Sequence, residues 1–196
     1  YNAGVLTQPF EPLSGLEGPY GIVAPFAWTL AGQTKVWLAR NKDGPGPVVS
    51  AAGSALQPVS TYPISTALAD YARSATLDDA EMMSYQDGGH TFACLSLPRA
   101  KKTWCVDVDR ASWTERGYWN SATGSYDLWR PRVHGYAWGT HLVGDRATGT
   151  VARMDRTLYA ELDGTAIRRL RRAPGLVQEH RRVPMDRLEL LMETGV

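Results

Sequence analysis

The stretch EMMSYQDGGHTFACLSL, residues 81–97, contains two segments of β-strand character on either side of a glycine-rich turn. Aromatic and aliphatic residues alternate with polar or small ones, which is the period expected of half-buried strands. Asp87, Gly88 and Gly89 supply the turn, because glycine readily adopts the positive φ angles that a tight connection requires. The stretch therefore predicts an antiparallel β-hairpin.

Similar short runs, bounded by Gly, Pro, Asp and Asn, follow one another along the chain and predict further strands. The runs are residues 26–30, 35–40, 48–51, 56–61, 81–85, 91–97, 103–107, 113–118, 134–138, 141–144, 150–154, 166–170 and 188–192. One helix is predicted over residues 66–73, with Ser65 or Thr66 as N-cap and Leu68, Tyr71 and Ala72 at helical spacing. We expect this helix to be a surface insertion.

A weak internal repeat runs through these strands. Residues 109–115, DRASWTE, align with residues 155–161, DRTLYAE. The aromatic segments 26–28, 82–85 and 136–138 also recur, each expected to be the buried first strand of a unit. Units of about 40 to 50 residues with four short antiparallel strands are typical of β-propeller blades.

We therefore expect an all-β fold, a partial β-propeller of about three four-stranded antiparallel blades, over residues 21–196 after a lead-in segment of residues 1–20. Complete propellers have four to eight blades, so a partner must cover the open edges of such an array. A β-sandwich of similar length is the alternative. The chain begins at Tyr1 and ends on Thr194-Gly195-Val196 without a polar tail, and we expect it to be a fragment of a longer protein.

Composition and charge are those of an ordinary folded protein. Of the 196 residues, 43% are apolar and 21% are charged, and the formal net charge of +1 does not by itself call for an acidic partner. Apolar runs are far too short to span a bilayer, so no membrane association is expected. The seven Trp and nine Tyr suit half-buried strands and assembly interfaces.

Cys94 and Cys105 flank the turn-like residues 98–102. A hairpin centred on residue 100 places the two cysteines on opposite faces, which makes a disulfide unfavourable. We expect two reduced, buried thiols.

No catalytic, cofactor or metal site is predicted. The four histidines, His90, His134, His141 and His180, lack metal-ligand spacing, and Asp107-Val108-Asp109 is expected to be a strand end running into a turn. The nucleotide-binding, hydrolase and CxxC motifs are absent from the sequence. Neither a cofactor nor a small-molecule substrate is expected.

The densest basic stretch contains Arg168, Arg169, Arg171 and Arg172. Such a run can bind a phosphate backbone or an acidic protein surface, or it can simply be solvated. Because Ile167, Leu170 and Leu176 interrupt the run, we expect part of the segment to pack. Assembly contact and DNA contact therefore both remain open for the four arginines.

Residues 87–92, DGGHTF, resemble the Asp-box turn of sialidase-type propellers, where the turn is structural. Tyr85 stands where that motif usually has Ser or Thr, so the match is partial. A carbohydrate-active, sialidase-like hydrolase is therefore the alternative function, and it would need converging arginines and a Tyr–carboxylate pair.

An ordered set of stretches resembles the tail hub, or packaged-DNA stabilisation, family of short-tailed bacteriophages. The stretches are residues 18–27, 66–73, 91–107, 112–116, 139–145 with 148–149, 167–174 and 187–196. They run in order along nearly the whole chain, which makes the set more specific than any one of them.

The resemblance implies a non-enzymatic, propeller-like structural component of a phage or prophage tail. It implies a homo-oligomeric ring, hexameric in known members, that closes the portal and adaptor channel, stabilises packaged DNA and docks the tail needle and tailspikes. It also implies synthesis in the bacterial host cytoplasm and a final location in the virion tail. The family provides no catalytic residue to carry over.

Overall fold

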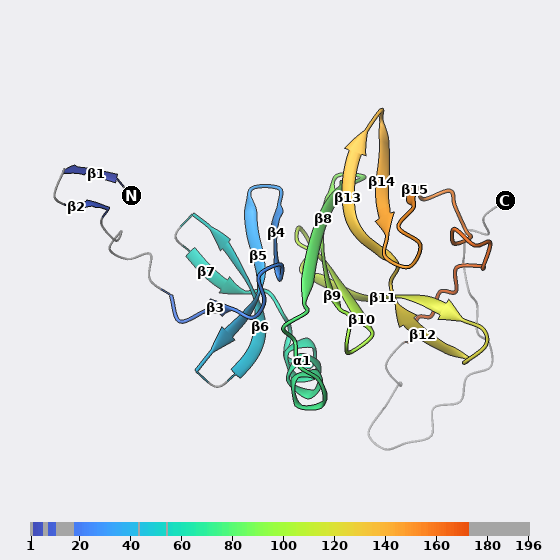
Figure 1. Cartoon of the computed structure of the whole chain (residues 1–196), viewed down its shortest axis with the longest axis horizontal. Coiled ribbons are helices and arrows are strands. Elements are labelled where there is room, and N and C mark those ends of the chain that lie inside the picture. The colour runs from blue at the N-terminus through green and yellow to red at the C-terminus, as the bar shows by residue number, and fades with distance from the viewer. Residues whose placement is uncertain (1, 6–7, 11–17, 43, 54, 173–196) are drawn as a thin grey trace, which may run out of the picture. The chain divides into compact units, whose positions relative to one another are not determined.

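The computed structural model describes residues 2–5, 8–10, 18–42, 44–53 and 55–172. The chain divides into two compact units, Tyr1–Met154 and Asp155–Val196 (Figure 1). Within the first unit, β1 (Asn2–Val5) and β2 (Gln8–Phe10) form an antiparallel hairpin. The helices of the described residues include none with the length and hydropathy of a membrane span.

The first blade is a meander of four antiparallel strands. Its strands are β4 (Trp28–Ala31), β5 (Thr34–Asn41), β6 (Gly44–Ala52) and β7 (Ala55–Pro58), and β3 (Gly21–Ile22) pairs with the far end of β5. Val36, Leu38 and Val48 are completely buried, because alternate positions of β5 and β6 point into the core.

The second blade has the same order of strands. It consists of β8 (Glu81–Asp87), β9 (His90–Leu97), β10 (Lys102–Asp107) and β11 (Ser112–Asn120). The first half of β11 pairs with β10, and its second half pairs with β12 (Ser125–Leu128). Gly117 begins that second half, where a Cβ atom would lie 2.9 Å from the Asp127 carbonyl oxygen.

The third sheet contains β13 (Pro131–Ala137), β14 (Thr140–Asp145) and β15 (Val151–Met154), again antiparallel and in chain order. Each of the three sheets opens with a hairpin of two-residue turn, at Gly32-Gln33, Gly88-Gly89 and Trp138-Gly139. The internal repeat of aromatic segments is therefore a repeat of these hairpins.

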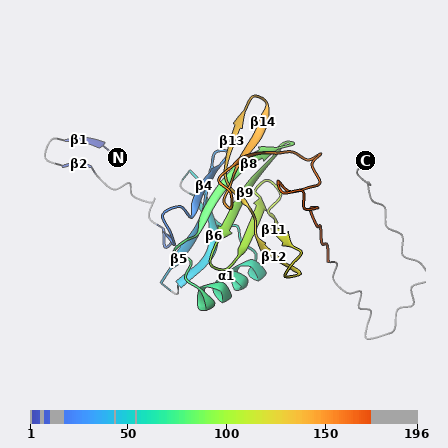
Figure 2. The same ribbon diagram turned by 45° about the vertical axis from the view of Figure 1, so that its right-hand side comes forward.

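The first strands of the three sheets lie side by side, with β8 in contact with β4 and with β13 (Figures 1 and 2). Between the first two sheets, Phe26 forms a parallel bridge with Glu81, and its carbonyl oxygen accepts the N–H of Met82 at 2.9 Å. The Ser84 hydroxyl donates to the Leu30 carbonyl at 2.7 Å. Short meanders that adjoin through their first strands are blades of a partial β-propeller, as the sequence predicted.

The second blade lies between the other two and is the central blade, and it is buried on both faces. Ala93, Leu95 and Leu97 of β9 pack in a cluster with residues of the first blade and of the helix, whereas Cys94 packs on the opposite face with Met83 and Tyr85. The period of two along β9 thus divides its side chains between two cores.

The single helix of the described residues, α1 (Tyr62–Ser74), is longer than predicted. It begins after Thr61 because Pro63 suits the first turn, whereas the prediction started at Thr66 and ended at Arg73. Ile64 and Leu68 are buried in the same cluster as the first blade, and α1 contacts β6. The expectation of a surface insertion is therefore wrong.

Most predicted strands are present with bounds shifted by a few residues, and β1, β2, β3 and β12 were not predicted. The predicted strand at residues 166–170 is wrong, since Ala166 forms an isolated bridge and the following residues have no regular structure. Residues 158 and 159, which the sequence repeat aligns with the start of β11, are likewise not a strand. The predicted strand at residues 188–192 lies outside the described residues.

The predicted register of the cysteine hairpin is also wrong. Cys94 lies directly opposite Cys105, because Leu97 pairs with Lys102 and four residues form the loop. Lys101 takes a positive φ of 52° and closes this loop. The pairing is offset by one residue from a hairpin centred on residue 100, and such an offset moves a side chain to the other face.

Candidate functional site

The arginine stretch, defined as Arg168, Arg169, Arg171 and Arg172, lies in the second unit, and all four side chains are exposed. A turn at residues 161–165 precedes it, closed by the Glu161 N–H donating to the Thr165 carbonyl at 2.8 Å and by Gly164 with a φ of 82°. The chain then runs back alongside Tyr159. The Ile167 N–H donates to the Tyr159 carbonyl at 2.9 Å, and the Arg169 guanidinium lies 5.8 Å from the Tyr159 ring centre.

The apolar residues of this stretch do not pack as expected. Ile167 is 40% exposed and Leu170 is 60% exposed, and Leu176 lies outside the described residues. The surface therefore presents four guanidinium groups, with Leu170 between them and Ile167 directly before them. Guanidinium groups bind phosphate or carboxylate oxygens in bidentate fashion, and aliphatic neighbours add contact area.

Exposed aromatic residues lie on the first hairpins of the outer blades. Phe26 and Trp28 precede or lie on β4, and Tyr136 and Trp138 lie at the end of β13, where Trp138 is 92% exposed. The expectation that each repeat opens with a buried strand is wrong for these two hairpins. It holds for Met83 and Tyr85 of the central blade, because that blade has a neighbour on each face.

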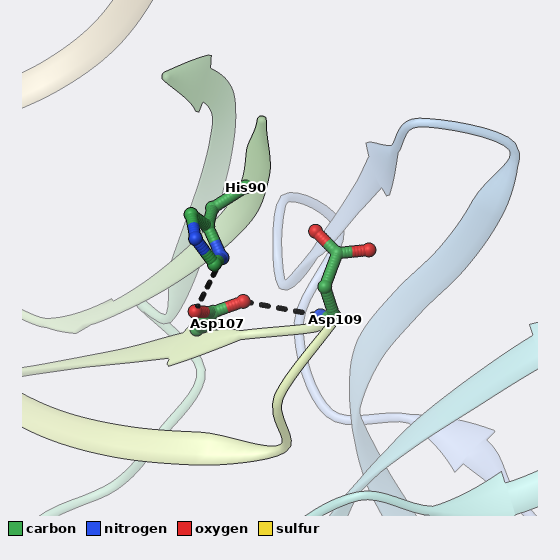
Figure 3. Close-up of side chains that lie close together, drawn as sticks. All are labelled: His90, Asp107 and Asp109. Atoms are coloured by element: carbon green, nitrogen blue, oxygen red, sulfur yellow. Dashed lines mark hydrogen bonds and ion pairs between the residues drawn. The ribbon is translucent and has the colours of Figure 1, made fainter. Parts of the chain in front are cut away.

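A histidine–aspartate cluster, defined as His90, Asp107 and Asp109, lies where β9 begins and β10 ends (Figure 3). The potential ligand atoms of the three side chains lie within 4.8 Å of one another. Sequence spacing could not reveal this group, because antiparallel pairing of β9 with β10 brings together residues far apart in the chain. In the structure Asp107 pairs with Phe92 and so lies near His90. The register predicted from the sequence was offset by one residue, so it did not show this proximity.

Each carboxylate of this cluster is occupied by the protein itself. Asp107 Oδ1 accepts the N–H groups of Asp109 and Arg110 at 3.1 and 3.3 Å, and Asp107 Oδ2 lies 3.0 Å from His90 Nδ1. Asp109 Oδ2 accepts the Thr91 N–H at 2.6 Å. These are the contacts of a loop cap, and they lie where the sequence predicted a strand end running into a turn.

The sequence analysis also missed a pair of histidines. His134 Nε2 and His141 Nδ1 lie 2.9 Å apart across β13 and β14, beside the rings of Tyr85 and Tyr136. Burial, together with the neighbouring His141, lowers the pKa of His134 below its ordinary value. The pair forms part of the junction between the second and third blades.

The Asp-box-like segment is a turn. Asp87 pairs with His90, and Gly88 and Gly89 have φ angles of 57° and 79°, as a two-residue hairpin turn requires. Tyr85 is covered by the guanidinium of Arg116 at 5.5 Å from the ring centre. Burial raises the pKa of the Tyr85 phenol, which makes it a poor nucleophile at neutral pH.

A family model described as "Phage_stabilise: Bacteriophage P22 Gp10, beta-propeller" matches residues 1–159. A search of curated proteins found no match.

Proposed function

The chain belongs to the phage stabilisation family described as bacteriophage P22 Gp10, beta-propeller, and on this premise we propose that it is a tail hub subunit that closes the portal and adaptor channel. It is a structural component of the phage virion, of the tail hub and DNA stabilisation type. The finer proposal is that it holds the packaged genome in place while docking the tail needle and tailspikes, without catalysing a reaction.

The observation that carries this proposal is the family match. The matched blades also expose apolar side chains on their first strands. Trp28 and Leu30 are each about half exposed on β4, and Val133 and Tyr136 are more exposed on β13. Exposed aromatic and aliphatic side chains on the first strands of the two outer blades suit contact with further β-structure or with another subunit. We propose a homo-oligomeric ring, a hexamer, in which such contacts recur around the axis.

The arginine stretch supplies a second surface, and we propose that it contacts packaged DNA or an acidic face of a neighbouring tail protein. Four exposed guanidinium groups would neutralise up to four phosphates and release their counterions. Contact with protein would depend on salt less steeply and would require a specific acidic partner. The subunit would be made in the bacterial host cytoplasm and end in the virion tail.

Native mass spectrometry and electron microscopy of the purified chain test the ring directly. We expect a discrete oligomer with rotational symmetry, of six subunits. A chain that stays monomeric at every concentration, alone and with the matching portal and adaptor proteins, would contradict the proposal.

Changing Arg168, Arg169, Arg171 and Arg172 to Gln tests the arginine stretch. If it contacts DNA, the slope of log affinity against log salt becomes shallower by up to about 4. The matched control changes four other exposed cations, Lys35, Arg40, Lys42 and Arg110, to Gln. An equal effect of both sets would show that overall charge, and not the arginine stretch, governs DNA binding.

The sialidase-like alternative is not favoured. The Asp-box-like turn closes a hairpin, and Tyr85 faces a guanidinium and two thiols. Turnover of a fluorogenic sialoside by the purified chain would revive that alternative.

A further inference from the structure

Cys94 and Cys105 form a dithiol at the centre of the second blade. They lie directly opposite each other on β9 and β10, and their Sγ atoms are 2.8 Å apart. Each side chain is 1% exposed, and both are free thiols. Opposed residues of an antiparallel pair have Cα atoms about 4.5 to 5.5 Å apart, which is within the range that a disulfide spans.

A buried guanidinium adjoins this dithiol. Arg116 on β11 lies over the rings of Tyr85, Phe92 and Trp129, with centre distances of 5.5, 5.6 and 5.0 Å. Its positive charge favours the ionised forms of Cys105 and Tyr85. The salt bridges found among the described residues include none to Arg116. Among the thiols and the phenol beside it, Cys105 is the group with a lowered pKa, so Cys105 is the one placed to carry a compensating negative charge.

The two thiols differ in acidity. The hydrogen bond from Cys94, together with the Arg116 guanidinium, holds the pKa of Cys105 below its ordinary value. Burial raises the pKa of Cys94. Cys105 is therefore the better thiolate and Cys94 the proton donor, which is how a nucleophilic thiol and a resolving thiol are distinguished.

We propose that Cys94 and Cys105 are an oxidative modification site at which an external low-molecular-weight disulfide converts the dithiol into a cross-strand disulfide. When local opening of the blade exposes Cys105, its thiolate attacks one sulfur of the external disulfide, and one thiolate leaves. Cys94 then loses its proton and attacks Cys105 Sγ, which expels the second thiolate. The chain loses two protons and two electrons, and the external disulfide is reduced to two thiols.

The disulfide would stabilise the second blade. The new bond would close the loop of residues 95–104 and link β9 to β10 within the core of the central blade. A loop of this length restricts the unfolded chain enough to raise the melting temperature by roughly 5 to 10 °C.

The test uses the folded full chain and oxidised glutathione. We expect a product lighter by two hydrogen atoms, without bound glutathione, in which tryptic peptides 74–99 and 103–110 are joined. We also expect the melting temperature to rise, and both changes to be reversed by dithiothreitol. Thiols that stay unmodified in the folded chain, or that stop at glutathione adducts, would overturn the proposal.

Variants assign the two roles. Cys94→Ser should stop at a glutathione adduct on Cys105, and Cys105→Ser should react far more slowly, because the remaining thiol is the less acidic one. Arg116→Gln should slow the first step about tenfold and shift its pH profile upward, whereas Arg116→Lys should retain part of the rate. Equal rates and pH profiles for all Arg116 variants would contradict the assigned role of the guanidinium.

Discussion

Glu81 at the start of β8 accepts a hydrogen bond from Nε of Arg132 on β13, at 2.7 Å. The second carboxylate oxygen of Glu81 lies 3.2 Å from Nη1 of Arg146, which follows β14. Glu81 is mostly buried, with 18% of its side chain exposed. One carboxylate therefore joins the second blade to two positions of the third, at the same strand end where the first blade also adjoins.

Glu81→Gln should destabilise the chain by about 1 to 3 kcal/mol, since it removes the negative charge between two guanidinium groups, one of them largely buried. Urea unfolding of the wild type and the variant measures this loss. The matched control is Asp70→Asn on α1, whose partner Arg73 is 75% exposed. That change should cost less than about 0.5 kcal/mol. Similar losses from both variants would show that Glu81 adds no more than a surface ion pair.

The loop caps give a second prediction. Asp107 Oδ1 accepts N–H groups two and three residues ahead, and Asn120 Oδ1 makes the same contacts with Ala122 and Thr123 in the next loop. Asp107→Asn should therefore cost less than about 0.5 kcal/mol, whereas Asp107→Ala should cost about 1 to 2 kcal/mol. Chemical denaturation compares the two variants. If Asn is as harmful as Ala, the contact of the carboxylate with His90 matters more than the cap.

The blades could be predicted because their signals are local. Alternation along β5 and β9 and the glycines at residues 88 and 89 depend on neighbours in the chain, so hairpins and their order follow from the sequence. Burial of whole strands could not be predicted in the same way. Phe26 and Trp138 have large aromatic side chains of the kind that cores contain, and their exposure depends on which blades have neighbours on both sides.

The side-chain clusters on β9 and β10 depend on the register in which these two strands pair. The conformation of a single loop residue decides that register. Lys101 adopts a left-handed conformation usually taken by glycine or asparagine, so the four-residue loop that pairs Cys94 with Cys105 has no clear sequence signal. The cluster of His90, Asp107 and Asp109 was missed for the same reason. The arginine stretch was evident from composition, but the exposure of Ile167 and Leu170 was not.

A third prediction concerns pH. The pKa of His134 is lowered by burial and by His141, so the unfolded chain binds a proton more readily than the folded chain. The contribution of His134 to stability is therefore complete above about pH 6.5 and is lost as the pH falls through its lowered folded-state pKa. Urea unfolding between about pH 7.5 and pH 5 should show this decline. His134→Gln should flatten the profile, and an unchanged slope would exclude His134 as its source.

The last prediction separates stability from assembly at Trp138. This residue and Gly139 are the central residues of the β13–β14 turn, with φ angles of 52° and 71°. A bulky residue is strained at such an angle, whereas Asn-Gly is the pair that this turn favours. Trp138→Asn should therefore stabilise the isolated chain by about 0.5 to 1 kcal/mol, measured by urea unfolding, and Trp138→Phe should change stability little.

The strain at Trp138 and its exposure of 92% together suggest that the side chain serves a contact with another molecule. Trp138→Asn should then weaken the oligomer, or its binding to other tail proteins, by at least tenfold in native mass spectrometry, while Trp138→Phe retains most of the affinity. A more stable Asn variant with unchanged assembly would leave the strain without a functional counterpart. A less stable Asn variant would show instead that the indole packs within its own subunit and that the turn tolerates the strained angle for that reason.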